Sequence, residues 1–268
     1  LIKMDVLIVG MRGLGVETAK NLILAGPRSV TIYDPTTVAI NDLGSNFYLK
    51  EEHVGKISRA AASTPILAEL NNYVKVTTID ELSVEDHKAY NVVVYTEKFF
   101  DGKRMIETNE FCRSNGAGMI CSEIMGAVGY CFVDYTDNHV VMDHDGEPCK
   151  QFIVSNISQA EKAVVTVHED KRHSFQDGDH VKFREVEGMI ELNDHQPIKI
   201  TNCKPFSFEL ELDTTKFNAY SRQGTIEDIK VPKKMPFDSL LKSTKNPVAS
   251  TVDGMLAVPD LSKFGRAE

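Results

Sequence analysis

The first half of the chain alternates short apolar runs with longer segments of helical pattern. Continuous apolar runs such as DVLIVG at 5–10 are typical of parallel strands that are covered on both faces. Further runs of strand length lie at 29–34, 74–80 and 91–97, and helices are expected between the runs at 16–25, 53–70 and 102–114. The neighbouring runs 118–126 and 130–135 suggest a strand hairpin. This alternation predicts an α/β fold with a doubly wound sheet.

The pattern changes near residue 143. From there to Pro232 the chain offers short β-branched runs separated by turn signals, namely FIVSNI, AVVTVHED, DGDHVKF, QPIKIT, FSFELEL and TIEDIKV. Close-set short strands without helical periodicity are typical of a small β-barrel. We therefore expect an α/β domain over 1–145, an inserted β-barrel over 146–233, and a segment over 234–268 that returns to the first domain. Within the expected helix 53–70, Pro65 should kink or split the helix.

Charge and apolar content narrow the class of protein. The net charge of −9, with no long block of either sign, argues against a nucleic-acid or anionic-membrane surface. The apolar runs are far shorter than the roughly 20 residues that span a bilayer, so no membrane helix is expected. The eight histidines lack the spacing of a metal site, so no metal ligand is predicted.

The five cysteines are widely spaced and form no C-x-x-C pair. Reduced thiols in a cytosolic or nuclear compartment fit this pattern best. Cys112, Cys121 and Cys131 fall in an expected helix and in expected strands, where buried, inert thiols are the usual outcome.

The stretch VGMRGLGVE at 9–17 has the form of a nucleotide-binding turn between a strand and a helix. In the fingerprint G-x-G-x-x-G, the three positions are held here by Gly10, Arg12 and Gly15, with Gly13 in addition. A helix N-terminus favours phosphate, but a side chain at the second position occupies the path of the phosphates. The residues thus leave two interpretations, a working loop and a vestigial one, and Arg12 favours the second.

Asp34 ends the second expected strand, where the fingerprint places an acid that binds ribose. It also precedes Pro35, and Asp-Pro pairs are common turn formers. Both roles, ribose ligand and turn former, remain open from the sequence, and the altered loop favours the turn.

Longer stretches carry a resemblance to a known family. LIVGMRGLGVETAKNLILAGPRSVTIYDP, with DLGSNFYLKEEHVGK and ILAELNNYV after it, resembles the inactive, Rossmann-like adenylation half of eukaryotic ubiquitin-activating enzymes. RHSFQDGDHVKFREVEGMIELN, followed by VPKKMPFDSL, is similar to the first catalytic-cysteine half-domain of the same enzymes. The similarity covers essentially the whole chain.

The resemblance implies a role in the ubiquitin conjugation pathway of the cytoplasm and nucleus. Members of this family are ligases that adenylate the ubiquitin C-terminus with ATP and Mg and then form a ubiquitin thioester. This chain would be their non-catalytic N-terminal part, a scaffold that pairs with the active half and flanks the ubiquitin cleft. Ubiquitin-conjugating enzymes would be recruited through domains outside the chain, and no cofactor is expected on this part.

The same resemblance implies that the chain carries no catalytic residue. Ser45 stands where the active half has a cation, and Glu97 is the only acid where a metal-binding aspartate is expected. Cys149 and Cys203 inherit no catalytic role. The apolar side chains of 119–130 are expected to be exposed and to face the active half.

Two alternatives stay open. An activating enzyme for another ubiquitin-like modifier would share the same motifs. From a different class, an NAD-dependent Rossmann dehydrogenase also begins with this strand–helix–strand unit, but it requires the second glycine and an obvious catalytic pair, and neither appears.

Overall fold

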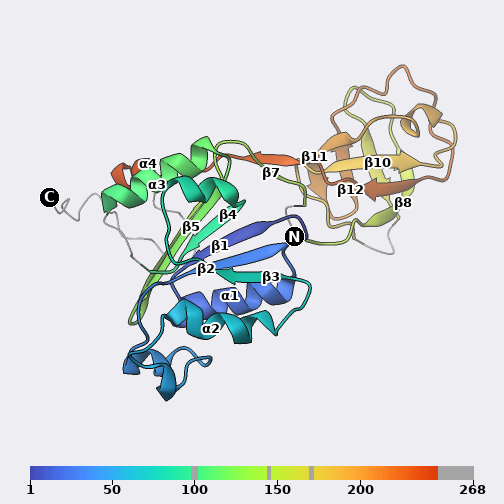
Figure 1. Cartoon of the computed structure of the whole chain (residues 1–268). Coiled ribbons are helices and arrows are strands. Elements are labelled where there is room, and N and C mark those ends of the chain that lie inside the picture. The colour runs from blue at the N-terminus through green and yellow to red at the C-terminus, as the bar shows by residue number, and fades with distance from the viewer. Residues whose placement is uncertain (98–101, 144–145, 169–171, 247–268) are drawn as a thin grey trace. The chain divides into compact units, whose positions relative to one another are not determined.

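The computed structural model of the chain describes residues 1–97, 102–143, 146–168 and 172–246 (Figure 1). It divides into two compact units, the first formed by Leu1–His139 with the chain from Met235 on, and the second by Val140–Lys234. The predicted return segment lies outside the described residues from position 247 on. Among the helices that are described, none has the length and apolar character needed to cross a membrane.

The first unit is built on a six-stranded sheet in the order β3-β2-β1-β4-β5-β6. Its strands are β1 (Asp5–Val9), β2 (Ser29–Tyr33), β3 (Lys75–Thr78), β4 (Val92–Tyr95), β5 (Gly118–Met125) and β6 (Val128–Asp134). The first five strands are parallel to their neighbours, and β6 runs antiparallel to β5. The mixed α/β class and the predicted hairpin are thus confirmed.

Helices cover both faces of this sheet (Figure 1). They are α1 (Gly13–Ala25), α2 (Arg59–Ala68), α3 (Gly102–Ser114) and α4 (Leu240–Lys245), with short 3-10 helices η1 (Ile40–Gly44), η2 (Glu51–His53) and η3 (Glu85–Ala89). Side chains of β1 alternate between the two cores, because successive residues of a strand point to opposite faces. Val6 and Ile8 pack with α1 and α2, whereas Leu7 and Val9 pack on the α3 side.

The expected helix 53–70 is shorter than predicted. It begins only at Arg59, because the Ser58 hydroxyl accepts a hydrogen bond from the Ala61 N–H and caps the first turn. The residues before it form η2 and turns. Contrary to the expected split, α2 continues through Pro65 to Ala68.

The second unit is a closed barrel in the order β10-β11-β12-β9-β8-β13. Its strands are β8 (Gln151–Ile157), β9 (Val164–Val167), β10 (His180–Arg184), β11 (Ile198–Lys204), β12 (Ser207–Leu210) and β13 (Thr225–Asp228). Each coincides with one of the six runs noted in the sequence, so the barrel prediction is confirmed. Phe183 and Phe208 are fully buried within it. Two further short strands, β7 (His139–Val141) and β14 (Lys233–Met235), pair with each other.

Candidate functional site

The glycine loop joins β1 to α1, and two of its glycines are required by close packing. Gly10 has a φ of +104°, in the region that favours glycine. A Cβ at Gly15 would lie 1.9 Å from the carbonyl oxygen of Gly10, and one at Gly10 would lie 2.7 Å from Thr96 Oγ1. The Thr96 hydroxyl in turn donates to the carbonyl oxygens of Val9 and Gly10 at 3.1 Å. The loop is therefore packed tightly against the end of β4.

Arg12 occupies the N-cap of α1 in an ordinary extended conformation, with φ −75° and ψ −170°. Its side chain is 61% exposed, and its Nε lies 3.3 Å from Glu97 Oε1. The two side chains line a cavity of about 530 Å³ with Gly13, Thr96 and Glu123, among others. Arg12 thus places a cation at the mouth of the loop, where it is paired with the acid that follows β4.

Asp34 lies beside the loop, as the fingerprint predicts, but its carboxylate is turned inward. The side chain is fully buried. Its Oδ2 accepts a 2.9 Å hydrogen bond from the Met11 N–H, and its Oδ1 accepts one of 2.9 Å from the Thr36 N–H. The second bond is that of an Asx turn, which is the turn-forming role considered for Asp34. Both oxygens are therefore engaged within the protein.

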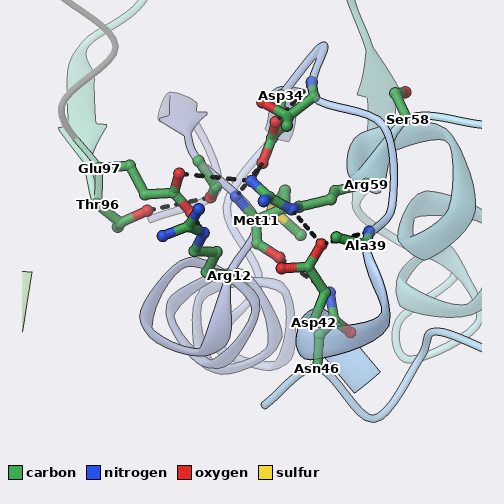
Figure 2. A network of polar contacts seen from close by, with 12 residues as sticks. Met11, Arg12, Asp34, Ala39, Asp42, Asn46, Ser58, Arg59, Thr96 and Glu97 are labelled. Atoms are coloured by element: carbon green, nitrogen blue, oxygen red, sulfur yellow. Dashed lines mark hydrogen bonds and ion pairs between the residues drawn. The ribbon is translucent and has the colours of Figure 1, made fainter. Parts of the chain in front are cut away.

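Arg59 completes the site and was not predicted from the sequence (Figure 2). Its side chain is only 3% exposed. Its Nε donates to Asp42 Oδ2 at 2.8 Å, and its Nη1 lies 3.4 Å from Asp34 Oδ2 and 3.5 Å from Glu97 Oε2. No local pattern of residues indicates this cluster, because Asp42 and Asp34 stand 17 and 25 residues before Arg59.

The environment moves the pKa values of this cluster in different directions. Burial alone would raise the pKa of Asp42, but the hydrogen bond from Arg59 and its charge, with the Ala39 N–H, hold the pKa below its usual range. Burial and the neighbouring charge of Asp34 raise the pKa of Glu97 against the opposing effect of Arg12 and Arg59. The pKa of Arg59 is raised despite its burial, since three carboxylates surround it. Arg59 is thus a permanent internal cation.

The segment that follows Asp34 packs on the other side of the loop. Asn46 is fully buried, and its Nδ2 donates to the Met11 carbonyl oxygen and to Ser63 Oγ, each at 3.0 Å. A Cβ at Gly13 would lie 3.1 Å from the Cβ of Ser45. Ser45 therefore reaches the start of α1, but its hydroxyl brings no cation there. Within the described ranges, no group of three or more His, Cys, Asp or Glu is arranged to hold a metal ion.

The thiols agree with the sequence analysis except at one position. Cys112 and Cys121 are buried, and burial raises the pKa of each to about 12. Cys131, expected to be buried, is exposed, because it lies in the first half of β6, which is exposed from Val128 to Cys131. Cys149 is also exposed, and partial burial with a hydrogen bond to Asp177 raises the pKa of Cys203 to about 12.

Comparison with known proteins relates the sequence of the chain to ubiquitin-activating enzymes. Residues 160–230, within the barrel unit, match the family model described as the ubiquitin-activating enzyme E1 FCCH domain. The chain is 40% identical over 263 residues to ubiquitin-like modifier-activating enzyme 1 of Homo sapiens, covering 98% of this chain and 24% of the relative. It is 41% identical over 265 residues to ubiquitin-activating enzyme E1 2 of Arabidopsis thaliana, with the same coverage.

The chain spans about a quarter of the length of these relatives. The similarity runs through both units, since it covers all but 2% of the chain. The resemblance found in the sequence is therefore confirmed: nearly the whole chain is similar to about a quarter of a ubiquitin-activating enzyme, and residues 160–230 match the E1 FCCH family model.

Proposed function

We propose that the chain is the non-catalytic N-terminal part of an enzyme that adenylates the ubiquitin C-terminus with ATP and Mg and then forms a ubiquitin thioester. In this proposal residues 1–145 are the inactive adenylation domain, 146–233 the first catalytic-cysteine half-domain, and 234–268 the return to the first. The strand order β3-β2-β1-β4-β5-β6 supports a Rossmann-type adenylation fold, because it is the order of dinucleotide-binding sheets.

The observation that carries the non-catalytic assignment is the state of Asp34. A ribose-binding acid must present an oxygen to the ligand, whereas the Asp34 side chain is fully buried, each of its oxygens accepts a backbone N–H, and one also faces Arg59. Gly10, Gly13 and Gly15 then persist for packing, and Arg12, paired with Glu97, stands at the second position of the fingerprint. We call this arrangement, in which Asp34 is buried and held within the protein, the closed site. ATP and Mg would act in the active half, outside this chain.

The proposed partner of the sheet unit is that active half. The stretch 119–130 is exposed only in part, because Met119 and Cys121 lie in the core. The end of the β5–β6 hairpin supports the proposal, because it carries an exposed apolar set of Ile124, Met125, Val128 and Tyr130, which are 63%, 54%, 66% and 42% exposed. Exposed apolar patches commonly mark protein interfaces. Ubiquitin would lie against the assembled enzyme, in the cytoplasm and nucleus, and conjugating enzymes would bind other domains.

Two alternatives define the experiment. An enzyme for a different ubiquitin-like modifier would have the same closed site, and a panel of modifiers offered to the full-length enzyme separates the two. A dehydrogenase would bind NAD at the loop. Thermal unfolding of this chain is measured with ATP-Mg and with NAD, since a ligand at 100 times its Kd stabilises the folded state by about 2.7 kcal/mol.

The expected result is an unchanged melting temperature with either nucleotide. A concentration-dependent rise with ATP-Mg that Arg12→Glu abolishes would contradict the closed site. The same response to NAD would favour the dehydrogenase.

A further inference from the structure

The guanidinium of Arg59, at the start of α2, contacts carboxylates from three other segments of the sheet unit: the end of β2 (Asp34), η1 (Asp42) and the stretch after β4 (Glu97) (Figure 2). The glycine loop joins the cluster through Asp34, which accepts the Met11 N–H. In a nucleotide-binding protein a bound nucleotide joins such elements from outside. Here Arg59, with its three carboxylates, joins them from within.

The segment 35–58 depends on these polar contacts, because its own apolar core is small. Val38 and Leu49 are its buried members, packed with Ala62 of α2. Leu43 and Val54 are only partly buried against this cluster, and Ile40 and Phe47 are 63% and 85% exposed. Apolar burial therefore holds the segment at few points, and the buried polar contacts add to it.

The ends of the segment are joined by backbone contacts that Arg59 and Asp42 reinforce. The Arg59 N–H donates to the Thr36 carbonyl oxygen at 2.9 Å, and the Val38 N–H donates to that of Ile57 at 3.0 Å. Asp42 Oδ2 accepts both the Arg59 Nε–H and the Ala39 N–H, at 2.8 and 2.9 Å. One carboxylate thus links the first turn of η1 to the buried cation.

From this geometry we infer that Arg59 is a built-in substitute for a nucleotide, which keeps the segment 35–58 folded against the glycine loop without any ligand. A guanidinium suits this task because its planar fork contacts several carboxylates at once and stays charged at every relevant pH. The inference rests on the proposed function for its contrast with a nucleotide site. It goes further in assigning to Arg59 the order of a whole segment.

The test is hydrogen–deuterium exchange of the full chain, followed by mass spectrometry of peptides from 35–58. Arg59→Met removes the cation at similar side-chain length and leaves three carboxylates facing one another. Exchange in these peptides is expected to rise at least tenfold, with little change in the barrel peptides. The matched control is Arg12→Met, which removes the exposed arginine of the same cluster and should leave exchange in 35–58 at the wild-type rate.

Asp42→Asn is the second variant, because Arg59→Met has the greater risk of unfolding the whole unit. It keeps a side chain of the same shape and the other two carboxylates, and it should speed exchange mainly in 38–46. If Arg59→Met folds and its 35–58 peptides exchange at the wild-type rate, the inference is overturned. If Arg59→Met does not fold, exchange at the wild-type rate in these peptides of Asp42→Asn overturns it. Protection gained by wild type on adding ATP-Mg would count against the closed site instead, so the two failures are distinguishable.

Discussion

The carboxylate of Asp34 holds the backbone of the glycine loop, because its Oδ2 accepts a hydrogen bond of 2.9 Å from the Met11 N–H. The loop is thus bound by the protein's own anion. The same oxygen faces Nη1 of Arg59 at 3.4 Å, so the loop amide and the buried cation share one acceptor.

Replacing Asp34 should destabilise the sheet unit more than replacing an exposed acid does. Asp34→Ala removes one partner of a buried ion pair and leaves the Met11 N–H without its acceptor. Loss of one such partner costs about 3–5 kcal/mol. Urea unfolding followed by circular dichroism measures the loss, and Glu52→Ala is the control, because the Glu52 side chain is 66% exposed. Equal stability of the two variants would show that the buried cluster contributes nothing.

Gly15→Ala should destabilise the chain without touching any charged group. The new methyl group would lie 1.9 Å from the Gly10 carbonyl oxygen, a distance that requires the helix or the loop to move. Overpacking of this kind costs about 1–3 kcal/mol or more. Gly44→Ala is the matched control, because a Cβ there meets nothing within 4 Å. A Gly15→Ala protein as stable as Gly44→Ala would mean that the loop packs more loosely.

The pH dependence of stability should contain a contribution from His87. Burial, opposed by hydrogen bonds with the carbonyl oxygens of Ser83 and Val84, lowers its pKa below 6.5. The other ring nitrogen lies 2.6 Å from the Tyr95 hydroxyl. Below pH 6.5 the unfolded chain binds a proton that the folded chain does not, so stability is lost as the pH falls toward the folded pKa.

This contribution is isolated by comparing wild type with His87→Gln. The difference in their melting temperatures should shrink between pH 7.5 and pH 5, since only wild type loses the histidine contribution. A difference that stays constant over this range would contradict the lowered pKa.

The cysteines should fall into two groups of reactivity. Cys131 and Cys149 are exposed and should react with a thiol reagent in the folded chain, whereas Cys112 and Cys121 are buried with pKa values of about 12 and should react only on unfolding. Mass spectrometry of peptides from the labelled chain shows which cysteines have reacted in the folded state. Rapid labelling of Cys121 in the folded state would show that the core beneath β5 opens.

The sequence predicted the elements whose pattern is local. β1, β2 and β4 are apolar runs, and each barrel strand lies between turn residues, so periodicity alone located them. The predicted helix 53–70 is too long, because apolar spacing does not show that Ser58 caps the helix at Arg59. The prediction that Cys131 is buried is wrong, because the strand pattern does not show that the first half of β6 is exposed.

The candidate site was predictable only in part. Gly10, Gly15 and Asp34 were found because they lie at fixed offsets in a known fingerprint. Arg59 is not predictable from the sequence, because an arginine in a helix is usually solvated and its partners come from three separate segments. The topology of the sheet determines such clusters, because β2, β1 and β4 are parallel neighbours and their carboxyl ends lie side by side.

The most direct test of the central claim, that this glycine loop no longer serves adenylation, is ATP:pyrophosphate exchange with ubiquitin, measured on the chain and on Arg12→Gly. Removing Arg12 frees the mouth of the loop but leaves Asp34 held by Met11 and Arg59. Since loss of one transition-state donor costs about 3–4 kcal/mol, the lack of a cation at Ser45 and of free acids keeps exchange at background. Background exchange in both proteins is the predicted result, and exchange well above background in either one would show that the glycine loop supports adenylation.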